Sequence, residues 1–289
     1  MRVFLAGCRS RTWCISDYIF GRGRPVAMGA AQRERVTERR DFPRHGSISG
    51  GQSLLGEREE TIPSRPADLN ILESFYYVDD LITSLIPHLK HFMLDSGAFT
   101  FFTQGKHVDW DEYVSRYIDY IKANDIKLFF ELDIDSLVGY DSVKEIRRRL
   151  ERETGKRPIP VWHKSRGKEE FLRMCDEYDY VAIGGIVSKE IKPEEYKYFP
   201  WFIREAHKRG TKIHGLGFTK LKSLGLYHFD SVDSSSWTSG NRFGHVYKFD
   251  GRMLQKHDKP AGTRMKPRET AINNFSEWVK FCQYAETHF

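Results

Sequence analysis

Long apolar runs are missing from this sequence. No stretch of about 18 consecutive apolar residues occurs, the length that a membrane-spanning helix needs. The apolar stretch near the first residue is too short for a signal peptide, and residues 2–7 instead have the pattern of a first strand. We therefore expect no membrane partner and a cytoplasmic location.

Cysteine is also scarce. Cys8, Cys14, Cys175 and Cys282 are scattered along the 289 residues, and no CxxC pair occurs. A disulfide framework is not expected at this density. A structural zinc site built of cysteines would need its ligands in close pairs. The sequence thus predicts a reduced protein.

The residues that are abundant indicate a globular protein with a sizeable core. Hydrophobic residues make up 39% of the chain and aromatic residues 14%, enough to bury a core at this length. The net charge is +6. This modest basic excess is consistent with a polyanionic partner.

Eight short apolar runs alternate with segments in which apolar residues have helical spacing. Runs that are apolar along their length are typical of parallel strands buried on both faces. Eight repeats favour an α/β fold, a (β/α)8 TIM barrel, as a single domain over residues 1–289. A doubly wound sheet is the competing architecture. The expected strands are 2–7, 69–77, 91–97, 127–135, 157–164, 180–187, 211–218 and 228–235.

Two segments do not fit this alternation. Residues 21–68 are rich in Gly, Pro, Ser and Arg, so we expect an inserted, partly disordered loop after strand one. A short helix near residues 30–39 is expected within it. Residues 240–289 begin with a basic segment and end in a helix, whose apolar side chains are expected to pack onto the barrel.

The most informative residues are two acids that follow apolar runs. Asp95 stands in HFMLDSGAF, and Asp230 stands in HFDSVDSSSW. The carboxyl ends of barrel strands meet at one mouth, where active sites lie, so we expect both acids in one site. A single Asp after a strand can also serve only as a helix cap. The strand ends carry Glu73, Ser74, Asp95, Ser96, Asp133, Asp135, His163, Lys164, Gly184, Gly185, His214 to Phe218, Asp230 and Asp233.

Three chemistries fit these residue types. Metal-assisted hydrolysis could use His163, His214 and one Asp as ligands, although no HExxH motif occurs. Glycoside hydrolysis uses paired carboxylates. In glycosyl exchange at a nucleoside, one Asp attacks C1′ and a second handles the proton of the leaving base. The residue types alone leave the three open.

Four motifs resemble those of the tRNA-guanine transglycosylase (queuine tRNA-ribosyltransferase) superfamily. DSGAF at 95–99 is similar to its DSGGF signature, and YVAIGGIV at 180–187 to its Gly-Gly base-binding loop. HGLGF at 214–218 resembles its next strand end, and FDSVDSSSWTSGNRFG at 229–244 resembles its nucleophile segment. The chain is most like the compact phage-type branch, which exchanges guanine in DNA for a 7-deazaguanine.

The resemblance implies a pentosyltransferase that needs no cofactor and holds no metal. Asp230 would be the nucleophile that forms a covalent glycosyl intermediate, and Asp95 the general acid/base. Asp133 would read the guanine-like edge of the base, with Asp135 as its rival. Asp233 is the alternative nucleophile, and motif position favours Asp230.

The resemblance also implies where base and nucleic acid bind. His163 falls where the family has a polar contact to the base. The other expected base-binding residues are Ser96, Gly184, Gly185, Phe99 and Phe218. Contacts to the nucleic acid are expected from Arg242, Lys248, Arg252, Arg264 and Lys266.

One departure from the family bears on the substrate. The tRNA enzymes carry a CxCxxC…H zinc site, and here Cys282 is the only cysteine after Cys175, so no zinc subdomain is expected. This favours DNA over tRNA, with a preQ0-like base inserted in host cytoplasm if the chain is phage-encoded. Such a base can shield DNA from restriction enzymes. A homodimer stays open. Two alternatives of another class are a non-catalytic nucleic-acid-binding paralogue and a metal-dependent barrel hydrolase.

Overall fold

The computed structural model describes most of the chain. Most of the segment 21–68 lies outside the described residues, and so do the short helix expected within it, Phe99 and Arg264. The described residues are 1–8, 11–21, 66–97, 100–101, 108–218, 220, 223–258, 262 and 266–289.

An all-parallel sheet forms the centre of the molecule. Its strands are β1 (Arg2–Ala6), β2 (Ala67–Ser74), β3 (Leu89–Asp95), β4 (Leu128–Phe129), β5 (Val161–Trp162), β6 (Tyr180–Ile183), β7 (Lys212–Gly215) and β8 (Ser231–Ser234). Their order in the sheet is β4-β3-β2-β1-β8-β7-β6-β5. A further parallel bridge, between Phe130 and Ile159, joins the two edges. This cyclic order is not that of a doubly wound sheet, and it is compatible with a TIM-barrel-like fold.

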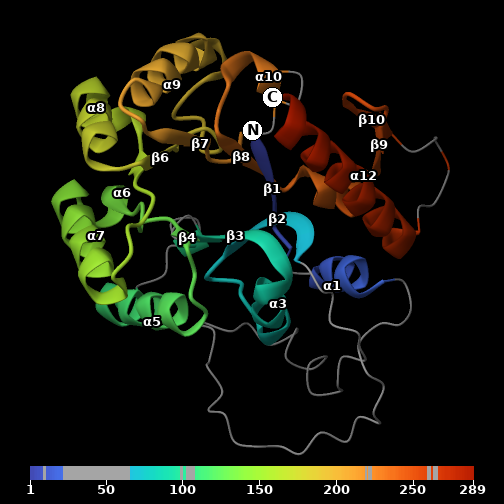
Figure 1. Cartoon of the computed structure of the whole chain (residues 1–289), viewed down its shortest axis with the longest axis horizontal. Helices are drawn as coiled ribbons and strands as arrows, with labels where there is room; N and C mark the ends of the chain where they lie inside the picture. Colours follow the sequence, from blue (N-terminus) through green and yellow to red (C-terminus); the bar gives the residue numbers. More distant parts are fainter. Residues whose placement is uncertain are drawn as a thin grey trace, which may run out of the picture.

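Helices surround this curled sheet (Figure 1). Local sequence sets several of their ends: Asp109 accepts the first N–H groups of α5, and Gly155 ends α7 in the left-handed conformation. The α-helices are α1 (Thr12–Phe20), α3 (Asp80–Leu85), α5 (Trp110–Ala123), α6 (Asp135–Val138), α7 (Tyr140–Thr154), α8 (Gly167–Glu177), α9 (Phe199–His207), α10 (Leu224–Tyr227), α11 (Gly240–Phe243) and α12 (Pro267–His288).

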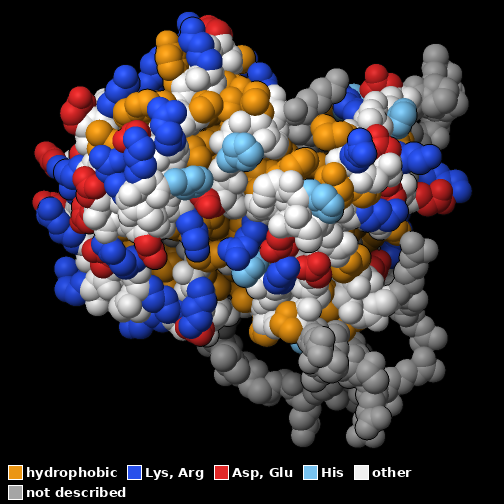
Figure 2. Space-filling model, turned by 45° about the horizontal axis from the view of Figure 1, so that its top comes forward, with side chains coloured by type: hydrophobic (Ala, Val, Ile, Leu, Met, Phe, Trp, Pro, Cys, Tyr) orange, Lys and Arg blue, Asp and Glu red, His pale blue; other side chains and the backbone are white. Residues whose placement is uncertain are grey.

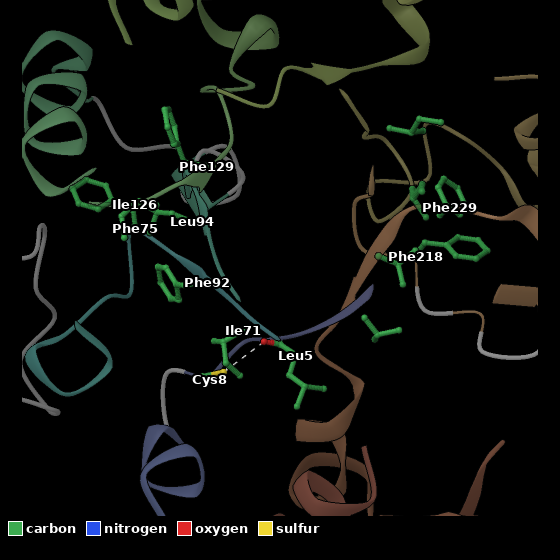
Figure 3. Close-up of a cluster of buried hydrophobic side chains, with 14 of the residues drawn as sticks. Leu5, Cys8, Ile71, Phe75, Phe92, Leu94, Ile126, Phe129, Phe218 and Phe229 are labelled. Carbon is green, nitrogen blue, oxygen red and sulfur yellow. Dashed lines mark hydrogen bonds between the residues drawn. The ribbon is translucent and has the colours of Figure 1, made fainter. Parts of the chain in front are cut away.

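The alternation of side chains along the strands produces two apolar layers. Phe4 and Met93 belong to a cluster enclosed by the curl of the sheet. Their neighbours Leu5 and Leu94 belong to the larger cluster on the other face of the sheet, where Leu94 lies beside Phe129 and Leu5 beside Ile71 (Figure 3). Full burial of each such side chain stabilises the fold by about 1.5–3 kcal/mol. Side chains that alternate to the same side as Phe4 and Met93 point into the curl of the sheet. Of these, only the ones at the carboxyl ends of the strands can meet inside the mouth.

The last part of the chain covers β1. A hairpin of β9 (His245–Phe249) and β10 (Leu254–Asp258) packs on α12. Asn274 of α12 accepts the N–H of Tyr247 at 2.9 Å and donates to the carbonyl of His245 at 3.0 Å. Trp278 and Phe281 are buried. Within the described part of the chain, no helix combines the length and the apolar character that a membrane crossing would require.

Candidate active site

Asp95 is the last residue of β3 and has the inward parity of Met93. Its side chain is partly exposed, and Oδ2 accepts the N–H of Gly97 at 3.2 Å. Burial raises the pKa of Asp95 to about 7, with further contributions from the charges of Asp133, Asp233 and Glu73. The carboxyl group thus changes its protonation state close to neutral pH.

Asp233 supplies the second carboxylate at this end of the sheet. It lies in β8, opposite Phe4 of β1, and is 8% exposed. Its Oδ1 accepts the N–H of Gly217 at 2.5 Å and lies 3.2 Å from Nε2 of His214. Since Phe4 belongs to the enclosed cluster, Asp233 also faces the interior, where its charge acts on Asp95.

The expected position of Asp230 in the mouth is wrong. β8 begins at Ser231, so Asp230 lies before its first residue. There its Oδ2 accepts the N–H of Ile213 at 2.7 Å and lies 2.8 Å from Nε2 of His207. In a parallel sheet this is the end away from Asp95, about 10 Å along the strand from Asp233. Of the two acids proposed as nucleophile from the sequence, only Asp233 shares the mouth with Asp95.

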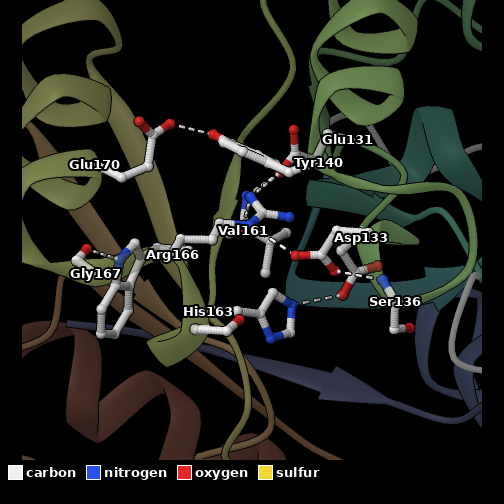
Figure 4. Close-up of polar contacts among 12 residues, drawn as sticks. Glu131, Asp133, Ser136, Tyr140, Val161, His163, Arg166, Gly167 and Glu170 are labelled. Carbon is white, nitrogen blue, oxygen red and sulfur yellow. Dashed lines mark hydrogen bonds and ion pairs between the residues drawn. The ribbon is translucent and has the colours of Figure 1, made fainter.

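Asp133 faces His163 across the ends of β4 and β5 (Figure 4). Oδ2 of Asp133 lies 3.4 Å from Nε2 of His163, an ion pair rather than a short hydrogen bond. Nδ1 of the same ring lies 3.0 Å from Oε2 of Glu190. Burial alone lowers the pKa of His163, but Asp133 and Glu190 together raise it to about 9. The ring is therefore an imidazolium at neutral pH, held between two carboxylates.

The carboxylate of Asp135 is paired with a cation rather than free in the mouth. Its Oδ2 accepts Nε of Arg166 at 3.0 Å. The same guanidinium donates to Oε1 of Glu131 at 3.0 Å and lies 4.2 Å from the centre of the Tyr140 ring. Glu131 is fully buried and also pairs with Arg147 at 2.5 Å. This ion cluster behind β4 and β5 fixes the loop that carries Asp133 (Figure 4).

Ser96, Gly184 and Gly185 lie at strand ends, as expected. Ser96 is fully buried, and its carbonyl accepts the hydroxyl of Tyr113 at 2.6 Å. A Cβ on Gly184 would come within 2.9 Å of Cε1 of His163, and one on Gly185 within 2.8 Å of Oε2 of Glu190. The two glycines thus leave the space that the His163–Glu190 pair occupies.

A cavity of about 400 Å³ opens beside Asp233, a size in the range of small-molecule sites. Nζ of Lys220 lies 4.5 Å from the centre of the Tyr196 ring, which stacks on Phe199. Phe218, one of the expected base-binding residues, is only 1% exposed and forms part of the cavity wall. The cavity is lined by Ile186, Val187, Tyr196, Gly217, Phe218, Lys220, Asp233, Ser235 and Ser236.

The basic residues expected to bind nucleic acid are dispersed within the described structure. Lys248 and Arg252 are exposed on the β9–β10 hairpin. Lys266 pairs with Glu269 at 2.8 Å. The side chain of Arg242 lies outside the described residues, as does Arg264. On the face in Figure 2, Lys and Arg side chains are interspersed with Asp and Glu.

Several residues of the site were not found from sequence. Glu190 and Lys220 lie in loops, and Arg166 ends the short 3-10 helix Lys164–Arg166, so no strand or long helix period marks their direction. Glu131 stands in ELDID two positions before Asp133, and that spacing is the one signal that could have included it. Among the described residues, no group of three or more His, Cys, Asp or Glu is arranged to hold a metal ion, so the hydrolase alternative gains no geometric support.

No protein-family model matches this chain. A search of curated proteins also finds no match.

Proposed function

We propose that this protein is a guanine transglycosylase, built on a closed (β/α)8 barrel, that replaces guanine in DNA with a 7-deazaguanine. The observation that carries the proposal is the set of three carboxylates at one end of the sheet. Asp95 has a pKa of about 7 because it is buried and faces Asp133 and Asp233. Base exchange needs a group of this kind, which donates a proton in one half-reaction and accepts one in the other.

Asp233 is the nucleophile in this proposal, in place of Asp230. A carboxylate oxygen of Asp233 attacks C1′ of the target nucleotide, and the C1′–N9 bond breaks. The electron pair of that bond goes to N9 of guanine, which takes the proton of the Asp95 carboxyl group. The products of this half-reaction are free guanine, a glycosyl ester on Asp233 and ionised Asp95.

The second half-reaction reverses these steps with a different base. Ionised Asp95 removes the proton from the ring nitrogen of the incoming 7-deazaguanine. That nitrogen bonds to C1′, and the ester bond breaks to restore the Asp233 carboxylate. One base replaces another at nearly equal bond energy, so the cycle needs no external energy source and no cofactor.

Asp133 is the group that would select the base. A guanine-like base presents two donors, N1–H and the amino group, and a carboxylate can accept both. His163 has both ring nitrogens next to carboxylates. We therefore assign His163 to orienting Asp133, rather than to direct contact with the base.

The cavity beside Asp233 supports a nucleic acid as the substrate. Lys220 is held over the Tyr196 ring at its wall, where a phosphate next to the target sugar would meet a cation. Ser235 and Ser236 add hydroxyl groups. A guanine within a duplex would have to leave the stack to reach Asp95 and Asp233.

Incubation with labelled 7-deazaguanine tests the proposal. Wild-type protein is expected to incorporate label into duplex or single-stranded DNA that contains guanine. Asp233→Asn should abolish incorporation, and Asp95→Asn should lower it roughly 10²- to 10⁴-fold. Asp230→Asn serves as the matched control, because it changes the same group at the far end of the same strand, and it should stay active.

Three outcomes would contradict parts of the proposal. Incorporation into tRNA but not DNA would replace the substrate while keeping the chemistry. Loss of exchange in Asp230→Asn with activity retained in Asp233→Asn would exclude Asp233 as the nucleophile. Binding of DNA without exchange of any guanine-like base would favour the non-catalytic alternative.

A further inference from the structure

A chain of polar groups crosses the interior of the sheet to reach Asp233. It begins at the hydroxyl of Tyr180 in β6, which lies 2.5 Å from Oγ of Ser231 in β8. Oγ of Ser231 lies 2.5 Å from Nδ1 of His214 in β7. Nε2 of His214 lies 3.2 Å from Oδ1 of Asp233. Three neighbouring strands thus place one continuous hydrogen-bonded chain below the mouth.

Which atom donates in each of these hydrogen bonds follows from Asp233, the last group of the chain. An ionised carboxylate can only accept, so Nε2 of His214 must carry the proton. In a neutral ring Nδ1 is then an acceptor, which receives the hydroxyl proton of Ser231. Ser231 in turn accepts from Tyr180. Every donor in the chain then points toward Asp233.

The ring of His214 cannot turn away from this position. It is fully buried, and its centre lies 5.3 Å from that of Phe130 and 6.2 Å from that of Phe4. Oδ1 of Asp233 also accepts the backbone N–H of Gly217. Among the described residues, both donors to this carboxylate reach Oδ1, and neither reaches Oδ2.

We propose that His214 is a positioning residue, which together with Gly217 fixes Oδ1 of Asp233 and leaves Oδ2 as the atom that attacks C1′. This inference rests on the proposed function for the identity of the reaction. Ser231 and Tyr180 act on Asp233 only through His214, because their hydrogen bonds keep the proton of His214 on Nε2. A donor lost from Oδ1 would let the carboxylate rotate, and misplacement by about 1 Å can cost 10²-fold in rate.

Two amide variants separate this role from simple filling of the core. Gln at position 214 can place an amide N–H close to the position of Nε2, whereas the shorter Asn places its amide near Nδ1. His214→Asn is expected to lower kcat for base exchange about 10- to 100-fold with KM for DNA nearly unchanged. His214→Gln should recover at least part of that loss. Equal kcat values for the two amides, or a loss confined to KM, would overturn the proposal.

A second measurement does not depend on activity. Nitrogen NMR of wild-type protein labelled at histidine reports which ring nitrogen of His214 is protonated. We expect a protonated Nε2, identified through the resonance that changes in Asp233→Asn. A bare Nε2 would overturn the proposal even in an active enzyme. A protonated Nε2 in a protein that exchanges no base would refute the proposed function and leave the hydrogen bond to Asp233 standing.

Discussion

Two carboxyl groups at the ends of neighbouring strands have pKa values raised chiefly by burial, but their surroundings differ. Burial raises the pKa of Glu73 to about 7, and its oxygens accept the N–H groups of Cys8 and Ser74. Glu73 therefore ties the loop after β1 to the end of β2. Asp95 has a similar pKa but is partly exposed toward the mouth. Exposure and contacts, rather than the pKa alone, distinguish the structural acid from the proposed reacting one.

The raised pKa of Asp95 predicts a stability cost above neutral pH. The unfolded carboxyl ionises near 3.8 and the folded one near 7, so its contribution to stability is fully present below pH 3.8 and is lost as pH rises through 7. Asp95→Asn should therefore be more stable than wild type at pH 8, on the order of 1–3 kcal/mol given partial solvent screening. The difference should shrink toward pH 4.

Urea unfolding at pH 4.5 and pH 8 measures this effect. Asp119→Asn is a suitable control, because Asp119 is an exposed residue of α5 and should give little change at either pH. An Asp95→Asn protein less stable than wild type at pH 8 would contradict the prediction.

A second residue-scale prediction concerns the pair formed by His163 and Glu190. The carboxylate of Glu190 helps to raise the pKa of His163 to about 9, so Glu190→Gln should lower that pKa by about a unit or more. Proton NMR titration of the imidazole resonances measures the midpoint. Glu194→Gln, at an exposed residue of the following 3-10 helix Pro193–Tyr198, should leave it unchanged. An unshifted midpoint in Glu190→Gln would show that Asp133 alone sustains the charge.

At the scale of elements, the turn after β3 depends on Gly97. Its φ is +78°, and an added Cβ would come within 2.8 Å of both Oγ of Ser74 and Cβ of Tyr76. Gly210 has a φ of +77° but nothing within 4 Å of an added Cβ. The two glycines therefore share a backbone conformation, but an added Cβ would be crowded at Gly97 and unobstructed at Gly210.

This contrast makes a matched pair of variants. Gly210→Ala should lose about 1 kcal/mol of unfolding free energy from backbone strain alone. Gly97→Ala should lose more, by roughly 1–3 kcal/mol, and should also lose activity because the N–H of Gly97 binds Asp95. Thermal unfolding and exchange assays measure both effects. Equal stability losses would show that the contacts around Gly97 relax without cost.

The sequence predicted the alternation of strands and helices better than the strand ends. Asp95 was expected at the end of its strand and lies there. The eighth strand was expected over 228–235 and pairs with β1 and β7 from Ser231. Asp230 was placed in the mouth although it stands near the start of the expected strand, and it precedes the observed one. A strand begins where its neighbours can pair with it, and local sequence does not contain that information. The partners of His163 and Asp135 depend likewise on loops distant in sequence.

At the scale of the whole molecule, the excess of positive charge is modest. The net charge is +6, yet acidic side chains interrupt the basic ones on the face in Figure 2. Binding of nucleic acid would then depend on a few placed cations near the mouth. Lys220 is the described lysine that lines the cavity beside Asp233.

Lys220→Met should therefore weaken binding of a guanine-containing oligonucleotide and reduce its salt dependence. Loss of one phosphate contact lowers the slope of log K against log salt by about 0.7–0.9. Fluorescence anisotropy at several salt concentrations measures the slope. Lys168→Met is the control, since Nζ of Lys168 lies over Trp201 at 5.3 Å and outside the cavity lining. An unchanged slope in Lys220→Met would remove Lys220 from the phosphate site.

The junction between β4 and β5 links the integrity of the sheet to the proposed selection of the base by Asp133. Each of these strands spans only two residues, and the bridge from Phe130 to Ile159 joins them. Beside that short seam, Glu131 accepts the N–H of Val161 and the guanidinium of Arg166. In the proposed barrel, the contacts that close the sheet between β4 and β5 thus also hold the loop that carries Asp133. Under the proposed function, loosening the seam would make the selection of the base less strict before it made the protein unfold.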